Sequence, residues 1–199
     1  MSKLYFRYAA MNAGKSTQLL QIAHNYESNK RLVALWTAKV DVRFGEGLVT
    51  SRLGAQRVAP VFDRDTDFKV AVRDFGLKAG QNVGAVLIDE AQFLTAEQVQ
   101  TLHLAAHQFN VPVMCFGLRT DFQGHPFPGS AMLLSLAEDI EEIRNTCECG
   151  SKATMNIRTD AEGNRLRQGP RVLIGDAQYR AVCGDCFHDV VKIPRRLAA

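Results

Sequence analysis

The feature that most restricts the fold of this chain is a Gly-Lys-Ser triplet between an apolar segment and a helical pattern. Residues 4–9 are mainly apolar and aromatic, as in a short buried strand, and AAMNAGKST leads from them into a helix over residues 14–27. Gly14, Lys15 and Ser16 match the end of G-x-x-x-x-G-K-[ST], a loop that wraps around phosphate groups. A chance triplet would lack this strand–loop–helix context. We therefore expect an α/β protein that binds a nucleotide.

Each part of this loop has an expected role. Backbone amides and the helix N-terminus bind phosphate oxygens, the lysine reaches the β- and γ-phosphates, and the serine ligates Mg²⁺. Ala9 stands where the pattern has its first glycine, and alanine tolerates fewer backbone conformations. The residues predicted to contact ATP are Ala9, Ala10, Met11, Asn12, Ala13, Gly14, Lys15 and Ser16.

A second motif, VLIDEAQF, ends an apolar strand over residues 83–89 with two acids. In phosphate-loop proteins the aspartate on this strand supports Mg²⁺, so Asp89 is a predicted magnesium ligand beside Ser16. Glu90 can take a proton from an attacking oxygen. The alternative is that both acids are simply solvated at the end of the strand. The presence of Lys15 upstream argues against this alternative. Asp89, Glu90, Ala91 and Gln92 are predicted to border the nucleotide.

Strand and helix patterns alternate over the first 146 residues. Such alternation predicts a parallel sheet with helices on both faces and ligands at the carboxyl ends of its strands. A strand lies between the two motif strands in the sequence, which indicates the recombinase-type division of phosphate-loop proteins. Residues 39–60 have no clean period and are interpreted as a mobile loop. Further strands are expected at 32–38, 111–118 and 140–144, and helices at 64–78, 95–109 (capped by Thr95) and 130–137.

The chain changes character near residue 147, so we predict an ATP-binding domain over 1–146 and a small domain over 147–199. This segment has β-like runs at 155–159 and 172–174, and it is too short to bury a core of its own. Two close cysteine pairs, C-x-C and C-x-x-C, favour a structural tetrahedral Zn²⁺ site. Unmetallated thiols or a redox dithiol are the alternative. The predicted zinc ligands are Cys147, Cys149, Cys183 and Cys186, with His188 as a spare candidate.

Several residues have a less specific interpretation. Cys115 lies in an apolar strand and is predicted to be a core thiol. His103 and His107 have the spacing of a two-histidine metal clamp but lack an H-E-x-x-H acid, which favours surface or partly buried histidines. Phe122 and Phe127 fall among Gly and Pro residues, and pocket and core remain equally open for them.

The composition restricts the classes of partner that we expect this chain to bind. The chain has 199 residues, 46% of them hydrophobic and 23% charged, with a formal net charge of +3. The charges are interspersed, which suits a protein that handles small anions and falls short of the basic stripe of a duplex-DNA binder. Lys3 and Arg7 interrupt the N-terminal apolar stretch, and no apolar run is long enough to cross a bilayer. We expect a cytoplasmic protein with no nucleic-acid or membrane partner.

Together these motifs closely resemble the zinc-containing thymidine kinase family. The resemblance covers nearly the whole chain in one order: AMNAGKST, DVRFG, DEAQFL, GLRTDF, CxCG and VLIG…Y…VCxxC. It implies a recombinase-like ATP-binding domain with an appended zinc ribbon. It also implies transfer of the γ-phosphoryl group of Mg·ATP to the 5′-hydroxyl of thymidine and of deoxyuridine, homotetramers, and inhibition by the end product dTTP.

The resemblance also implies roles for individual residues. Glu90 is the implied base toward the 5′-hydroxyl, and Asp41 and Arg43 help to hold the acceptor and the transferring phosphate. A lasso that reads the pyrimidine through its backbone is closed by Tyr179. The residues implied around the base are Met11, Phe93, Leu118, Phe122 and Phe127, and those of the lasso are Arg171, Val172, Leu173, Ile174 and Gly175. IGDAQY is one residue shorter than the expected lasso pattern, which affects the contacts from Gly175 to Tyr179.

Two rival functions share some of these motifs. A recombinase-type motor would need a basic single-strand groove with stacking aromatic residues and would be stimulated by DNA. A zinc-ribbon binding module with a regulatory ATP site would bind nucleotide without turnover. Neither accounts for the ordered set of motifs.

Overall fold

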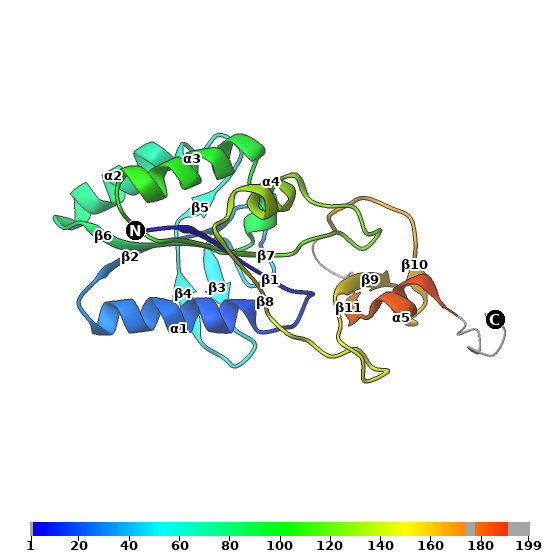
Figure 1. Ribbon diagram of the computed structural model, residues 1–199. Coiled ribbons are helices and arrows are strands. Elements are labelled where there is room, and N and C mark those ends of the chain that lie inside the picture. The colour runs from blue at the N-terminus through cyan, green and yellow to red at the C-terminus, as the bar shows by residue number, and fades with distance from the viewer. Residues whose placement is uncertain (1, 174–177, 191–199) are drawn as a thin grey trace.

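The computed structural model describes residues 2–173 and 178–190, and its main body is a six-stranded sheet (Figure 1). The strand order is β5-β2-β6-β7-β1-β8, and every pair in it is parallel. β7 lies between β1 and β6, so a strand separates the two motif strands, as predicted. The strands are β1 (Leu4–Tyr8), β2 (Leu32–Ala38), β5 (Val61–Phe62), β6 (Val83–Ile88), β7 (Val113–Gly117) and β8 (Asp139–Glu142).

Helices cover both faces of this sheet, which confirms the predicted fold class. In Figure 1, α1 lies on one side of the sheet and α2 and α3 lie on the other. Thr95 caps α3 in a capping box with Gln98, the start signal that the sequence indicated. The helices are α1 (Lys15–Ser28), α2 (Phe68–Ala79), α3 (Ala96–Gln108) and α4 (Pro128–Leu136), with a 3₁₀ turn η1 (Ala91–Phe93) after β6.

The strands send alternate residues into two cores, as their period of two requires. Leu87 of β6 packs with Leu19 of α1, whereas Val86 and Ile88 pack on the opposite face. Cys115 is fully buried in that second core, and burial raises the pKa of its thiol. The prediction of a core thiol is thus confirmed. Among the described residues, none of the helices combines the length and apolar character needed to cross a membrane.

The segment 39–60 is more regular than the sequence indicated. Strands β3 (Leu48–Thr50) and β4 (Gln56–Val58) pair antiparallel, so the mobile loop expected over 39–60 is not a loop at these residues. Each strand has only three residues, too few for a readable period. Val49 is buried with the core under α1, and this tertiary contact stabilises the hairpin.

The C-terminal segment forms a small unit, which we call the ribbon and define as residues 147–173 and 178–190. Its antiparallel sheet has the order β10-β9-β11, followed by the short helix α5. The predicted strand at 155–159 is confirmed as β9. The β-like run at 172–174 was wrong for 172 and 173, which lie outside any strand, and residue 174 lies outside the described residues. The elements are β9 (Met155–Thr159), β10 (Arg165–Leu166), β11 (Gln178–Val182) and α5 (Gly184–His188).

Candidate active site

The phosphate loop connects β1 to α1 and turns through left-handed backbone at two positions. Gly14 has φ 85° and Asn12 has φ 66°. A side chain at Gly14 would meet no neighbouring atom, so its backbone conformation is the reason for glycine there. Ala9, by contrast, is buried and is not among the residues with positive φ. Alanine therefore causes no strain at the first position of the pattern.

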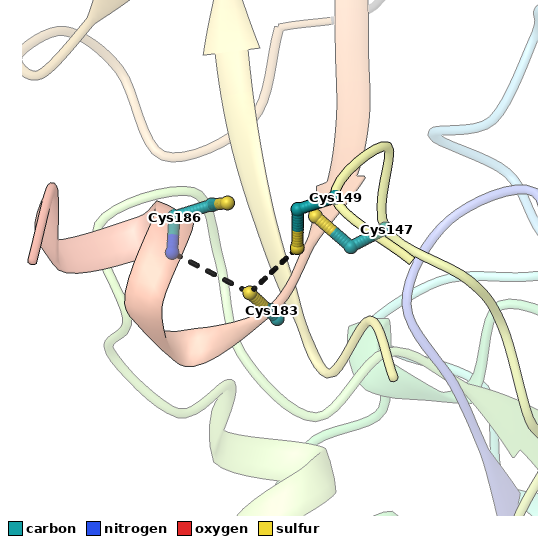
Figure 2. Close-up of side chains that lie close together, drawn as sticks. All are labelled: Cys147, Cys149, Cys183 and Cys186. Atoms are coloured by element: carbon teal, nitrogen blue, oxygen red, sulfur yellow. Dashed lines mark hydrogen bonds between the residues drawn. The ribbon is translucent and has the colours of Figure 1, made fainter. Parts of the chain in front are cut away.

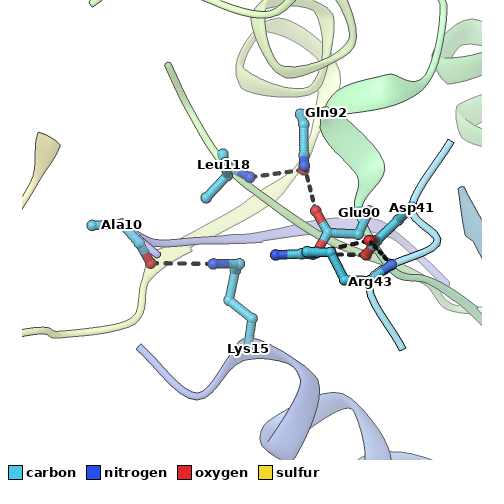
Figure 3. A network of polar contacts seen from close by, with 7 residues as sticks. All are labelled: Ala10, Lys15, Asp41, Arg43, Glu90, Gln92 and Leu118. Carbon is cyan, nitrogen blue, oxygen red and sulfur yellow. Dashed lines mark hydrogen bonds and ion pairs between the residues drawn. The ribbon is translucent and has the colours of Figure 1, made fainter. Parts of the chain in front are cut away.

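Lys15 folds back over this loop. Its Nζ donates to the carbonyl oxygen of Ala10 at 3.1 Å (Figure 3), and only 9% of the residue is exposed. Burial lowers the pKa of Lys15, and the nearby Glu90 and Asp89 oppose this effect. A buried ammonium group next to a helix N-terminus provides a strong site for phosphate oxygens.

Glu90 enters the same space from the end of β6. Its backbone is left-handed, with φ 51° and ψ 39°, a conformation that costs energy for a residue with a side chain. One carboxylate oxygen accepts from Arg43 Nη2 at 2.6 Å and the other accepts from Gln92 Nε2 (Figure 3). Gln92 in turn accepts from the amide of Leu118 at 3.0 Å. Gln92 thus fixes Glu90 relative to the end of β7.

Asp89 lies behind Glu90 and is almost fully buried, at 4% exposure. Burial, together with the neighbouring charge of Glu90, raises the pKa of Asp89 to about 7. A cation at this point would stabilise the ionised carboxylate. The position therefore suits an acid that supports a divalent metal ion.

Arg43 brings the loop after β2 to the site. Its guanidinium donates to both carboxylate oxygens of Asp41 at 2.7 Å, as well as to Glu90. The hydrogen bond to Asp41 is the largest cause of a raised pKa for Arg43, which is therefore a permanent cation. Although 36% of its side chain is exposed, it faces the same space as Lys15.

Aromatic rings line the same space as Glu90. Phe93 and Phe127 meet edge to face with ring centroids 6.0 Å apart. Phe122 is 2% exposed and stacks on the guanidinium of Arg158 at 3.7 Å. Phe122 and Phe127 are both buried and both line the cavity, so they belong to core and pocket alike.

Most of these groups line one cavity of about 1160 Å³. Ala9, Ala10, Asp89 and Ala91 do not line it and lie buried. Ile174 and Gly175 lie outside the described residues. The predicted residues that line the cavity are Met11, Asn12, Ala13, Gly14, Lys15, Ser16, Asp41, Arg43, Glu90, Gln92, Phe93, Leu118, Phe122, Phe127, Arg171, Val172, Leu173 and Tyr179.

Two asparagines, one of them in the ribbon, make contacts that sequence reasoning missed. The amide of Met11 donates to Asn156 Oδ1 at 2.7 Å, and the carbonyl of Met11 accepts from Asn145 Nδ2 at 2.8 Å. Asn156 lies on β9 and is 3% exposed. Two asparagines thus hold both backbone polar groups of Met11 in the phosphate loop. No local pattern marks them, because the pairing exists only in the folded chain.

Asp121 is a second missed residue. Its carboxylate accepts from Arg171 Nε at 2.7 Å and from the amides of Gln123 and His125 at 2.9 Å. Arg171 also lies over the ring of Phe127, at 5.2 Å from the centroid. Asp121 therefore anchors the start of the predicted lasso. Its place in the motif GLRTDF was the signal that could have identified it.

The four cysteines converge at one end of the ribbon (Figure 2). Their Sγ atoms all lie within 4.8 Å of one another, and those of Cys149 and Cys183 are 3.5 Å apart. Hydrogen bonds from Ser151 lower the pKa of Cys149 to about 6, whereas the contact with Cys183 raises that of Cys186 to about 12. Four thiols this close do not all ionise unless a cation balances their negative charge. The cluster could bind a metal ion through four thiolates.

The sheet order, the phosphate loop and the acid pair define a phosphate-loop nucleotide-binding protein of the class with a strand between its motif strands. A family model described as "Thymidine kinase" matches residues 2–187. The chain belongs to the thymidine kinase family.

Relatives named "Thymidine kinase" match along nearly their whole length. One from Chromobacterium violaceum is 61% identical over 189 residues, covering 94% of this chain and 99% of that protein. Another from Albidiferax ferrireducens is 51% identical, covering 94% and 93%. A third, from Idiomarina loihiensis, is 49% identical, covering 92% and 94%. A Pif1 helicase structure from Candida albicans superposes with a TM-score of only 0.39 at 13% identity, covering 71% of this chain and 36% of that one, too weak a likeness for any inference.

Proposed function

We propose that this protein transfers the γ-phosphoryl group of ATP to the 5′-hydroxyl of thymidine, and of deoxyuridine, giving the nucleoside monophosphate and ADP. The observation that supports this most is a shared cavity. Lys15 of the phosphate loop, the acid Glu90 and a wall of phenylalanine rings all line it. One side suits a triphosphate and the other suits a flat, mostly apolar base.

Glu90 acts as the base in this proposal. Its carboxylate takes the proton of the 5′-hydroxyl, and the oxygen attacks the γ-phosphorus. The bond from that phosphorus to the bridging oxygen breaks, and ADP leaves. Arg43, which pairs with Glu90 in this structure, turns to the transferring phosphoryl group and frees the carboxylate. Lys15 balances charge on the β- and γ-phosphates.

The oxygen groups of Ser16 and Asp89 suit Mg²⁺, since both are hard ligands and Asp89 is a buried acid with a raised pKa. When bound, Mg²⁺ would neutralise charge on the phosphates. This chain's own part is to hold the triphosphate with the loop from Ala9 to Ser16 and to orient the acceptor with Glu90 and Asp41.

The lasso begins at Arg171, whose guanidinium donates a hydrogen bond to the carboxylate of Asp121. Tyr179 Oη donates to the carbonyl of Leu173 at 3.3 Å, which links the two ends of the segment. We propose that backbone groups of this segment read the pyrimidine while Met11, Leu118, Phe122 and Phe127 enclose the base and its methyl group. A closed pocket of this kind excludes water and larger purines.

Zinc fits the cysteine cluster, because four close thiolates form the closed tetrahedral set of a structural site. We propose a functional division into an ATP-binding domain over 1–146 and a ribbon domain over 147–199.

Reduced thiols support a cytoplasmic location, since five free cysteines persist best in a reducing compartment. From the family resemblance we also infer a homotetramer and feedback inhibition by dTTP.

Measuring ADP release from Mg·ATP with a panel of acceptors tests the reaction. The panel contains thymidine, deoxyuridine, deoxycytidine, deoxyadenosine, single-stranded DNA and no acceptor. We expect release to depend on thymidine or deoxyuridine. Release that DNA stimulates and nucleosides leave unchanged would refute the kinase and favour a motor.

A further inference from the structure

A group of metal-ligating side chains lies away from the cavity, where α3 passes the start of β1 and β8. His103 and His107 stand four residues apart on α3, and each places Nε2 near the same oxygen of Glu138, at 3.2 and 2.7 Å. Glu138 directly precedes β8. The three donor atoms lie within 4.8 Å of one another. Sequence reasoning set the histidines aside for want of an acid, and the fold brings one from beyond α4.

The carboxylate of Glu138 is held in this position from its other side. Its second oxygen accepts from the amide of Leu4 at 2.7 Å, and the amide of Glu138 donates to the carbonyl of Leu4 at 3.0 Å. Burial tends to raise the pKa of Glu138, but the bonds from Leu4 and His107 outweigh it and leave the pKa below its usual value. The group is therefore a carboxylate at neutral pH, with one oxygen directed at two imidazoles.

We propose that His103, His107 and Glu138 bind a divalent transition-metal ion such as zinc, with water completing the coordination. Two imidazoles and one carboxylate form a borderline ligand set that suits zinc, nickel or copper better than magnesium or calcium. Tetrahedral zinc with bonds of about 2.0–2.2 Å places its donor atoms roughly 3.3 Å apart. The nitrogen–oxygen distances of 3.2 and 2.7 Å need only a small opening to meet this geometry.

The position of the site predicts its effect. It joins α3 to the N-terminal ends of β1 and β8, whereas the phosphate loop follows the carboxyl end of β1. A bound ion would therefore link a helix to the sheet far from the reacting groups. It stabilises the folded chain by mass action and leaves the rate of phosphoryl transfer unchanged.

Calorimetric titration of Zn²⁺ into protein whose cysteine cluster is already zinc-loaded tests the site. We expect the wild type to bind one further ion at pH 7.5 and its melting temperature to rise with zinc. His103→Gln and His107→Gln should each weaken this binding by about tenfold or more and reduce the rise in melting temperature. His24→Gln is the matched control, because His24 is also an exposed helical histidine and lies outside the cluster.

Glu138→Gln separates coordination from folding. Glutamine can still accept from Leu4, so circular dichroism should stay that of the wild type while zinc affinity falls. Kinase turnover should be the same in all four variants. The proposal is overturned if the wild type binds no ion beyond the cysteine cluster, or if a His103→Gln/His107→Gln double variant binds it equally well. Either result would leave only hydrogen bonds between the histidines and Glu138.

Discussion

The six-stranded sheet and the ribbon are stabilised by different means. The sheet buries apolar side chains against helices on both faces, with Leu4, Phe6 and Ile88 among those fully enclosed. The ribbon has a core of six buried residues, two of which are the cysteines Cys147 and Cys183. So small a core leaves the ribbon dependent on its thiols and on neighbouring contacts. The proposed catalytic groups lie in the part with the large apolar core, and the proposed lasso lies in the part with the small one.

Because of this difference, we expect the largest loss of structure and activity from a substitution at Cys183. Cys183→Ser should abolish zinc binding at the cysteine cluster, unfold the ribbon and eliminate thymidine-dependent turnover, because structural zinc contributes about 10–16 kcal/mol in small zinc domains. Zinc analysis, limited proteolysis and far-ultraviolet circular dichroism would follow the two regions separately, and the sheet should remain folded.

Cys115→Val is the matched control for loss of a thiol from the sheet. Valine fits a buried strand, and its cost should stay below about 1.5 kcal/mol. A ribbon that remains resistant to protease in Cys183→Ser would show that apolar packing holds it and would remove the contrast between the regions.

The second-largest effect should come from loss of the proposed proton acceptor next to the six-stranded sheet. Glu90→Gln removes the proton acceptor but keeps the hydrogen-bonding shape, so turnover should fall by about 10²–10⁴ while ATP affinity changes little. Steady-state rates and nucleotide titration would measure both quantities. Glu97→Gln, on the exposed side of α3, should match the wild type. Normal turnover in Glu90→Gln would remove this residue from the mechanism.

A smaller effect should appear where the regions meet. Asn156→Ala leaves the amide of Met11 without its partner, at a cost of about 1–3 kcal/mol. The KM for ATP should rise by about tenfold with a lesser change in kcat. Asn164→Ala is the control, because the hydrogen bonds of Asn164 to Asp160 stay within an exposed turn. Unchanged ATP affinity in Asn156→Ala would mean that the ribbon does not support the phosphate loop.

The smallest effect concerns pH and the stability of the ligand-free protein. The pKa of Asp89 is raised from 3.8 to about 7, so its contribution to stability is present at low pH and is lost as pH rises through 7. Unfolding of the wild type and of Asp89→Asn between pH 5 and 8 would measure it. We expect the wild type to lose stability relative to the variant as pH rises, and Mg·ATP to reverse the loss. Parallel curves would contradict the assignment.

The fold and much of the site followed from local patterns. The strand–loop–helix context predicted the position of Lys15, and the apolar run before Asp89 predicted β6. The short strands β3 and β4 were missed, because three residues carry no period and their order comes from contacts with α1. Asn156 and the pairing of His107 with Glu138 were missed because tertiary contacts between distant segments create them. Alanine is tolerated at position 9 because its backbone φ is not positive, and no sequence pattern reveals that angle.

The fate of the γ-phosphoryl group tests most directly whether the cavity joins two substrates. ATP labelled at the γ-phosphate would be incubated with the protein, with and without thymidine, and the label would be followed in each product. We predict that the label appears in thymidine monophosphate in step with ADP and that little inorganic phosphate forms without thymidine. Label released as inorganic phosphate at the same rate with and without thymidine would contradict this account.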